Sequence, residues 1–145
     1  MKLVIQRVKQ ASVSVDDKVV GSINRGMVIL LGVDKKDTLK DIDYCVTKAT
    51  ELRMFEDQNN KMNLSSKDVG AEVLIVSQFT LCSNCDKGRR PSFDTAADPV
   101  KAQEYYEIFS EKVRERGLRV ATGQFRAMMD VSLVNDGPVT FILES

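Results

Sequence analysis

The run from Gly26 to Val33 constrains the fold more than any other stretch, because it contains no polar or charged side chain. A continuous apolar run of this kind is typical of a strand that is covered on both faces. A shorter run, Val73–Val76, predicts a second buried strand. The chain must therefore cover a central sheet with other elements. Its 145 residues are enough for a single domain, residues 1–145, with a hydrophobic core.

Two helices are predicted to provide this cover. The first has Asp37 or Thr38 as its N-cap residue. The second has Asp98 at the N-cap, Pro99 at the first helical position and Gly117 beyond its end. Apolar residues recur at helical spacing in both, namely Leu39, Ile42, Cys45, Val46, Ala49 and Leu52 in the first, and Ala102, Tyr105 or Tyr106, Phe109 and Val113 in the second.

The remaining segments favour strands. A first strand begins near Leu3, and Asp16-Asp17-Lys18 predicts the turn of a hairpin. The strand that starts at Val73 is expected to continue to residue 81. Apolar residues alternate with period two from 125 to 133, and a last strand is expected over 139–143. Many strands with two covering helices predict a mixed, strand-rich α/β fold.

Composition excludes several classes of protein. Lys plus Arg and Asp plus Glu both number 21, so the formal net charge is zero and nucleic acid would have to bind to a local basic patch. The apolar runs are too short to cross a membrane, and polar residues follow Met1 too soon for a signal peptide. Three cysteines argue against a disulfide framework and for a reducing compartment. These features predict a cytoplasmic protein.

The stretch V-S-Q-F-T-L, residues 76–81, sets two hydroxyls at the end of a buried strand. In many hydrolases a histidine would activate Ser77 or Thr80, but this chain contains no histidine. A catalytic role for these residues therefore needs a mechanism that does not depend on an imidazole base.

The pair Cys82–Cys85 has the C-x-x-C spacing of zinc and redox sites. A zinc site needs about four ligands, and Cys45 is the only other Cys or His in the chain. A redox pair would normally begin a helix, whereas this pair is expected to end a strand and enter a loop. We predict neither a metal nor a redox role for it.

Lys87-Gly88-Arg89-Arg90-Pro91 is the sharpest cluster of positive charge. It is explained either as a solvated loop or as a set of phosphate contacts that do not read sequence. The stretch Asn135-Asp136-Gly137-Pro138 is explained most simply as a hairpin turn, because Asp-Gly tolerates positive φ and Pro fixes the return.

Four segments together resemble the D-aminoacyl-tRNA deacylases. They are Gln6-Arg7-Val8, Ser77-Gln78-Phe79-Thr80-Leu81, Lys87-Gly88-Arg89-Arg90-Pro91-Ser92-Phe93 and Asn135-Asp136-Gly137-Pro138-Val139-Thr140, in this order. The resemblance runs along the whole chain, and the set is specific although each piece alone is weak. The cysteine pair at 82 and 85 departs from the family without affecting a catalytic assignment.

The resemblance implies an enzyme that hydrolyses the ester between a D-amino acid and the 3′-terminal ribose of tRNA, and that also removes glycine from mischarged tRNA. It implies a homodimer with a strongly curved, barrel-like sheet, active sites at the subunit interface, tRNA as partner, and no cofactor or metal. Ser77, Gln78, Phe79 and Thr80 match the catalytic motif, and Gly137-Pro138 matches a Gly–cis-Pro element that enters the partner's pocket. By position, Ala102, Phe125 and Met129 line the adenosine pocket, although Phe125 and Met129 equally fit a core role, and Arg7 braces the Gly-Pro element.

This implied chemistry removes the need for a histidine. An aminoacyl ester is already activated, so the enzyme has to hold the carbonyl and stabilise the oxyanion with N–H groups, for which Phe79 and Thr80 are the expected donors. The ribose 2′-hydroxyl would orient the attacking water. The carbonyl groups of Gly137 and Pro138 would reject L-amino acids by a clash at Cα that glycine escapes.

Three alternatives stay open. Thr80 can act as a nucleophile if some group supplies its base. A relative on the same fold can edit L-aminoacyl-tRNA with relaxed chirality. A dimeric module of another class can bind nucleic acid through Lys87, Arg89 and Arg90 without catalysis. The amino acids and tRNAs that are the physiological substrates do not follow from the sequence.

Overall fold

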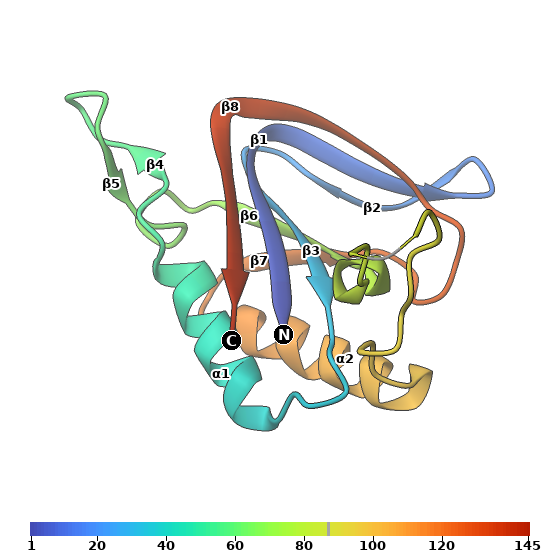
Figure 1. Ribbon diagram of the computed structural model, residues 1–145. Helices are drawn as coiled ribbons and strands as arrows, with labels where there is room; N and C mark the ends of the chain where they lie inside the picture. The colour runs from blue at the N-terminus through green and yellow to red at the C-terminus, as the bar shows by residue number, and fades with distance from the viewer. Residues whose placement is uncertain (87) are drawn as a thin grey trace.

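The computed structural model describes residues 1–86 and 88–145, so Lys87, one of the predicted phosphate contacts, lies outside the described residues. Its main sheet has the order β2-β1-β3-β6-β7, with β8 paired to the free side of β1. A short hairpin, β4–β5, stands apart from this sheet (Figure 1). The strands are β1 (Lys2–Val15), β2 (Lys18–Ile23), β3 (Gly26–Gly32), β4 (Phe55–Glu56), β5 (Met62–Leu64), β6 (Glu72–Ser77), β7 (Arg119–Thr122) and β8 (Asp130–Glu144).

The sheet curls so that β2 and β7, the two ends of the strand order, come into contact. β1 and β8 are long, bent strands that pair with each other in both halves, from Lys2 opposite Glu144 to Ser14 opposite Asp130. The contact between β2 and β7 is close at Gly21, where an added Cβ atom would lie 2.6 Å from the carbonyl oxygen of Thr122. The predicted strongly curved, barrel-like sheet is therefore confirmed.

The two predicted helices are present and lie side by side on one face of the sheet (Figure 1). α1 (Leu39–Glu51) begins with Thr38 as N-cap, in a capping box with Asp41. α2 (Pro99–Glu115) has Asp98 as its N-cap residue, and the carboxylate of Asp98 accepts hydrogen bonds from two backbone N–H groups. Both sequence-based caps are confirmed, with Thr38 rather than Asp37 in the first helix. None of the helices in the described part of the chain is long and apolar enough to cross a membrane.

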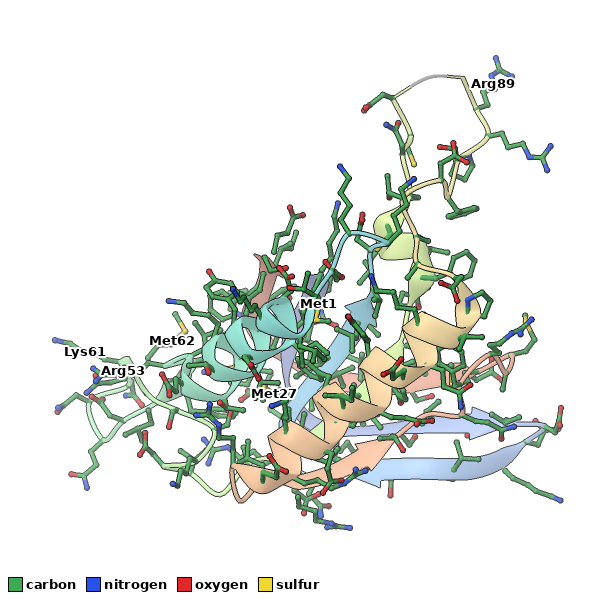
Figure 2. All side chains as sticks on the ribbon, turned by 90° about the horizontal axis from the view of Figure 1, so that it is seen from below. Met1, Met27, Arg53, Lys61, Met62 and Arg89 are labelled. Atoms are coloured by element: carbon green, nitrogen blue, oxygen red, sulfur yellow. The ribbon has the colours of Figure 1, made fainter. Side chains whose placement is uncertain are left out.

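Two apolar clusters fill the structure. The larger one joins the helices to the sheet and includes Met27, Ile75 and Phe109, all fully buried. Met27 is labelled in Figure 2. The smaller one lies inside the curl of the sheet and includes Val28 and Val76. The strands β3 and β6 thus contribute to both clusters, which explains why their sequences are apolar without alternation.

Three predicted boundaries were wrong. The strand expected over 73–81 ends at Ser77, and a 3-10 turn (Phe79–Cys82) follows it. Residues 123–129 belong to no strand and contain a turn around Phe125 and Arg126, so the strand predicted from 125 begins only at Asp130. Asn135–Pro138 is not a hairpin turn: β8 continues through it, and the pairing with β1 shifts register on either side of Val8.

Candidate active site

A cavity of about 530 Å³ opens where β3 and β6 end and α2 begins. Its wall is mainly apolar. Arg126 is the one charged side chain among the described residues that line it. The lining includes six of the predicted site residues, namely Ser77, Gln78, Phe79, Ala102, Phe125 and Met129.

The backbone turns sharply at the edge of this cavity. The N–H of Gln78 still donates to the carbonyl oxygen of Leu31, at 2.8 Å, as a continuation of the pairing between β3 and β6. After Gln78 the backbone no longer pairs with β3. The N–H of Leu81 donates instead to the carbonyl oxygen of Gln78, at 3.2 Å, within the same turn. Phe79 and Thr80 are the first residues of this 3-10 turn, so the turn gives their N–H groups no acceptor. No acceptor for either N–H is found elsewhere in residues 1–86 and 88–145.

Gly32 makes room for this turn. A Cβ atom at Gly32 would lie 2.9 Å from Cβ of Leu81, 3.1 Å from the oxygen of Gln78 and 3.2 Å from Sγ of Cys82. All three atoms belong to the turn that carries the free N–H groups. The missing side chain of Gly32, the last residue of β3, therefore allows the turn to pack closely against this strand.

Within residues 1–86 and 88–145, no basic side chain is hydrogen-bonded to the hydroxyl of Ser77 or Thr80. Thr80 Oγ1 accepts a hydrogen bond from the side-chain amide of Gln78, which is its one side-chain partner in the described chain. An amide has no basic lone pair at neutral pH, so it cannot deprotonate Thr80. The arrangement leaves the backbone N–H groups, rather than a hydroxyl nucleophile, as the chemically useful groups.

Tyr106 fixes the wall of the cavity. Its hydroxyl donates to the carbonyl oxygen of Ile75, at 2.8 Å, and its ring lies 6.0 Å from that of Phe125 between centroids. Burial raises the pKa of Tyr106 to about 12, so the hydroxyl stays protonated at neutral pH. Its role is to hold α2 and the turn at Phe125 against the end of β6.

Gly137 and Pro138 lie outside the residues that line the cavity of their own chain. Both residues are exposed and lie in the bent part of β8. The peptide bond between them is cis, as the resemblance led us to expect. The side-chain amide of Asn135 spans this element, since it donates to the oxygens of Arg7 and Val139, at 3.0 and 3.4 Å.

Arg7 holds the same element from within the protein. Its side chain is buried, and the residue is only 4% exposed. It donates to the carbonyl oxygens of Asp136, at 3.1 Å, and Met54, at 2.7 Å. It also forms ion pairs with Glu56 and Asp136. The guanidinium thus joins the bend of β8 to the base of the β4–β5 hairpin.

Arg89 lies on a loop that projects away from the helices and the sheet (Figure 2). Arg89 and Arg90 are exposed, and neither forms an ion pair with a described residue. The two arginines are therefore available to an anionic ligand.

The cysteines are not arranged as a metal site. Cys82 is buried and Cys85 exposed, and burial raises the pKa of the Cys82 thiol. Within residues 1–86 and 88–145, no group of three or more His, Cys, Asp or Glu side chains is placed to hold a metal ion.

Sequence reasoning missed several lining residues. Tyr106 was predicted only as a core residue, and its contact with Ile75 gives no signal in the sequence. Arg126 has a positive φ of 64°, in a turn that the period-two pattern concealed. The others that were missed are Leu31, Val33, Val76, Ala97, Pro99, Ala127, Met128 and Val131.

Comparison with known proteins gives consistent matches. The family model for D-Tyr-tRNA(Tyr) deacylase matches residues 4–144. The D-aminoacyl-tRNA deacylase of Geotalea daltonii is 57% identical over 145 residues, which is 100% of this chain and 97% of that protein. The protein of the same name from Thermotoga petrophila is 54% identical, with coverage of 100% and 97%.

Two solved structures are similar. One, described as a c-Myc DNA unwinding element binding protein, has a TM-score of 0.94 and 42% identity and covers 100% of this chain and 99% of its own. Another, described as a probable eukaryotic D-amino acid tRNA deacylase, has a TM-score of 0.83 over 98% and 97% of the two chains. Its identity of 20% supports the fold alone.

Proposed function

The chain belongs to the D-Tyr-tRNA(Tyr) deacylase family and is a hydrolase of D-aminoacyl-tRNA, and we propose that it works by positioning the ester rather than by attacking it with a side chain. The observation that carries this proposal is the pair of free N–H groups at Phe79, which lines the cavity, and at the next residue, Thr80. The described lining of this cavity has no side-chain base. The bond cleaved is the ester between the amino acid and the 3′-terminal ribose of tRNA.

The two N–H groups stabilise the negative charge that develops on the ester carbonyl oxygen. Removal of one such donor typically costs about 10²–10³ in rate, so two preorganised donors supply a large part of the catalysis. The substrate's own 2′-hydroxyl orients the attacking water. Hydrolysis then releases free tRNA and the amino acid without a covalent enzyme intermediate.

The terminal adenosine occupies the apolar part of the cavity, against Ala102, Phe125 and Met129. The phosphates of the tRNA contact Lys87, Arg89 and Arg90 without sequence readout. The exposure of Arg89 and Arg90, and their lack of described acidic partners, support this arrangement.

The enzyme acts as a homodimer in the cytoplasm, and each cavity is completed by Gly137 and Pro138 of the partner subunit. This proposal is supported by the exposure of both residues, by their position outside the lining of their own cavity, and by the bracing from Arg7 and Asn135. Their carbonyl groups form a wall beside Cα of the substrate and accept hydrogen bonds from its ammonium group.

Such a wall selects by exclusion. A thousandfold preference for D- over L-aminoacyl-tRNA corresponds to about 4 kcal/mol, which a clash with any carbon substituent at that position supplies more readily than an attractive pocket. Glycine has no side chain to clash, so glycyl-tRNA is cleaved as well.

Deacylation of one tRNA charged with a D-amino acid, its L enantiomer or glycine tests the function. We expect rapid release from the D and glycyl substrates and release at least about a thousandfold slower from the L substrate. Comparable cleavage of both enantiomers would contradict chiral editing and would indicate an editing enzyme with relaxed chirality.

A second candidate function is nucleic-acid binding without catalysis. It is favoured by the likeness to the protein described as a c-Myc DNA unwinding element binding protein, whose backbone superposes on this chain with a TM-score of 0.94. Binding of duplex DNA by this chain together with no turnover of any aminoacyl-tRNA would support that function and contradict ours.

A further inference from the structure

Two phenyl rings stand exposed beside the mouth of the cavity. Phe79 and Phe93 are 58% and 38% exposed, and their ring centroids lie 5.0 Å apart with the planes tilted by 56°. A pair of large apolar side chains left in water is informative, because burial of either ring would stabilise the protein. The two residues come from different segments, the 3-10 turn after β6 and the long loop before α2.

The loop that carries Phe93 is anchored on both sides of the ring. Asn84 and Ser92 exchange two backbone hydrogen bonds, at 2.9 and 3.0 Å. On the other side, the carbonyl oxygen of Asp94 accepts from the ammonium group of Lys35, and the Thr95 hydroxyl donates to the oxygen of Cys82, both at 2.7 Å. The aromatic pair is therefore held in place before any ligand binds.

The surroundings of the pair indicate the class of ligand. Phe79 lines the cavity, and in the proposed function its N–H contacts the ester on the terminal ribose. The RNA strand must leave that ribose toward the open side of the cavity. Arg89 and Arg90 precede Phe93 on the same loop, exposed and without described acidic partners, where a phosphodiester chain would be attracted.

We propose that the Phe79–Phe93 pair is a stacking site for the base of the nucleotide that directly precedes the terminal adenosine of the tRNA. This inference rests on the proposed function. Stacking on an aromatic side chain tolerates any base, since every base has a π-face. The site therefore fixes the direction in which the acceptor end enters the cavity without selecting among tRNAs.

A double-mutant cycle tests the proposal. Wild-type protein and Phe93→Ala are each assayed for kcat/KM on D-aminoacyl-tRNA, with the preceding nucleotide either intact or abasic. We expect Phe93→Ala to lower kcat/KM by about 5- to 150-fold on the intact substrate, the usual range for one stacked base. On the abasic substrate the same substitution should have little further effect.

Two matched variants separate stacking from packing. Phe93→Trp retains an aromatic face and should keep the activity on intact substrate, whereas Phe93→Leu retains apolar volume and should behave like Phe93→Ala. Equal losses on the intact and abasic substrates would overturn the stacking site while leaving the deacylase function in place. Dissociation of the dimer by Phe93→Ala, measured by light scattering, would also overturn it, because the ring would then belong to the subunit interface. No turnover by the wild-type protein would instead refute the proposed function.

Discussion

Substitution of Gly32 by Ala tests how the end of β3 positions the catalytic turn. The new methyl carbon would lie 2.9 Å from Cβ of Leu81, whereas carbon atoms in contact prefer about 3.5–4.0 Å. The turn that carries the N–H groups of Phe79 and Thr80 must therefore move by roughly 0.6 Å or more. A displacement of this order costs about a hundredfold in rate when it misaligns catalytic groups, while the overpacking costs about 1–3 kcal/mol of stability.

The assay compares two alanine variants for stability in urea and for kcat on D-aminoacyl-tRNA. Gly70→Ala is the control, because Gly70 has a φ of 61° at the opposite end of β6, and a Cβ atom there would contact nothing within 4 Å. The left-handed conformation makes alanine unfavourable by about 1–2 kcal/mol, so this variant loses stability without moving the turn. We expect a large loss of kcat in Gly32→Ala and none in Gly70→Ala. Equal kcat in the two folded variants would refute the role of Gly32.

Three further predictions follow from the contacts of individual charged residues. Arg7→Lys keeps the charge but loses the forked donors, so it should reduce stability by about 2 kcal/mol in urea unfolding and raise the cleavage of L-aminoacyl-tRNA relative to the D form. Arg89→Ala combined with Arg90→Ala should weaken the binding of all tRNAs alike. It should also make the slope of log K against the logarithm of salt concentration shallower by about 1 to 2. Weaker binding of one tRNA alone would contradict this prediction. The hydroxyl and N–H of Thr38 lower the pKa of Asp41 to about 2. Because the unfolded carboxyl titrates near 4, the stabilisation should be complete above about pH 4 and lost as pH falls through about 2, and urea unfolding of Asp41→Asn should lack this dependence.

Sequence patterns predicted the two helices and the buried strands β3 and β6 because burial dictates them, whereas β4, β5 and β7 were not predicted. The apolar runs at β3 and β6 required cover on both faces, and the helix caps at Thr38 and Asp98 are local hydrogen bonds that depend on few residues. The curvature of the sheet came from the family resemblance, since it depends on the long pairing between β1 and β8, residues far apart in the chain.

The errors in the fold cluster around the proposed active site. Alternation from Phe125 to Leu133 suggested one strand, yet the first five residues turn so that Phe125 and Met129 face the cavity. The apolar character of Phe79 and Leu81 likewise extended a strand that ends at Ser77. Phe125 and Met129 are partly buried against the core clusters and also line the cavity, and periodicity alone cannot separate these two roles.

In the proposed mechanism water attacks the ester, two backbone N–H groups stabilise the oxyanion, and no side chain acts as nucleophile. The most direct measurement is single-turnover deacylation of D-aminoacyl-tRNA by a folded, dimeric Thr80→Ala variant, with mass spectrometry of the quenched wild-type reaction. We expect the variant to release the amino acid at a measurable rate, and we expect no mass of an acylated protein in the wild-type reaction. Complete loss of activity in the folded variant, or an acyl group attached to Thr80 in the wild-type enzyme, would contradict the mechanism.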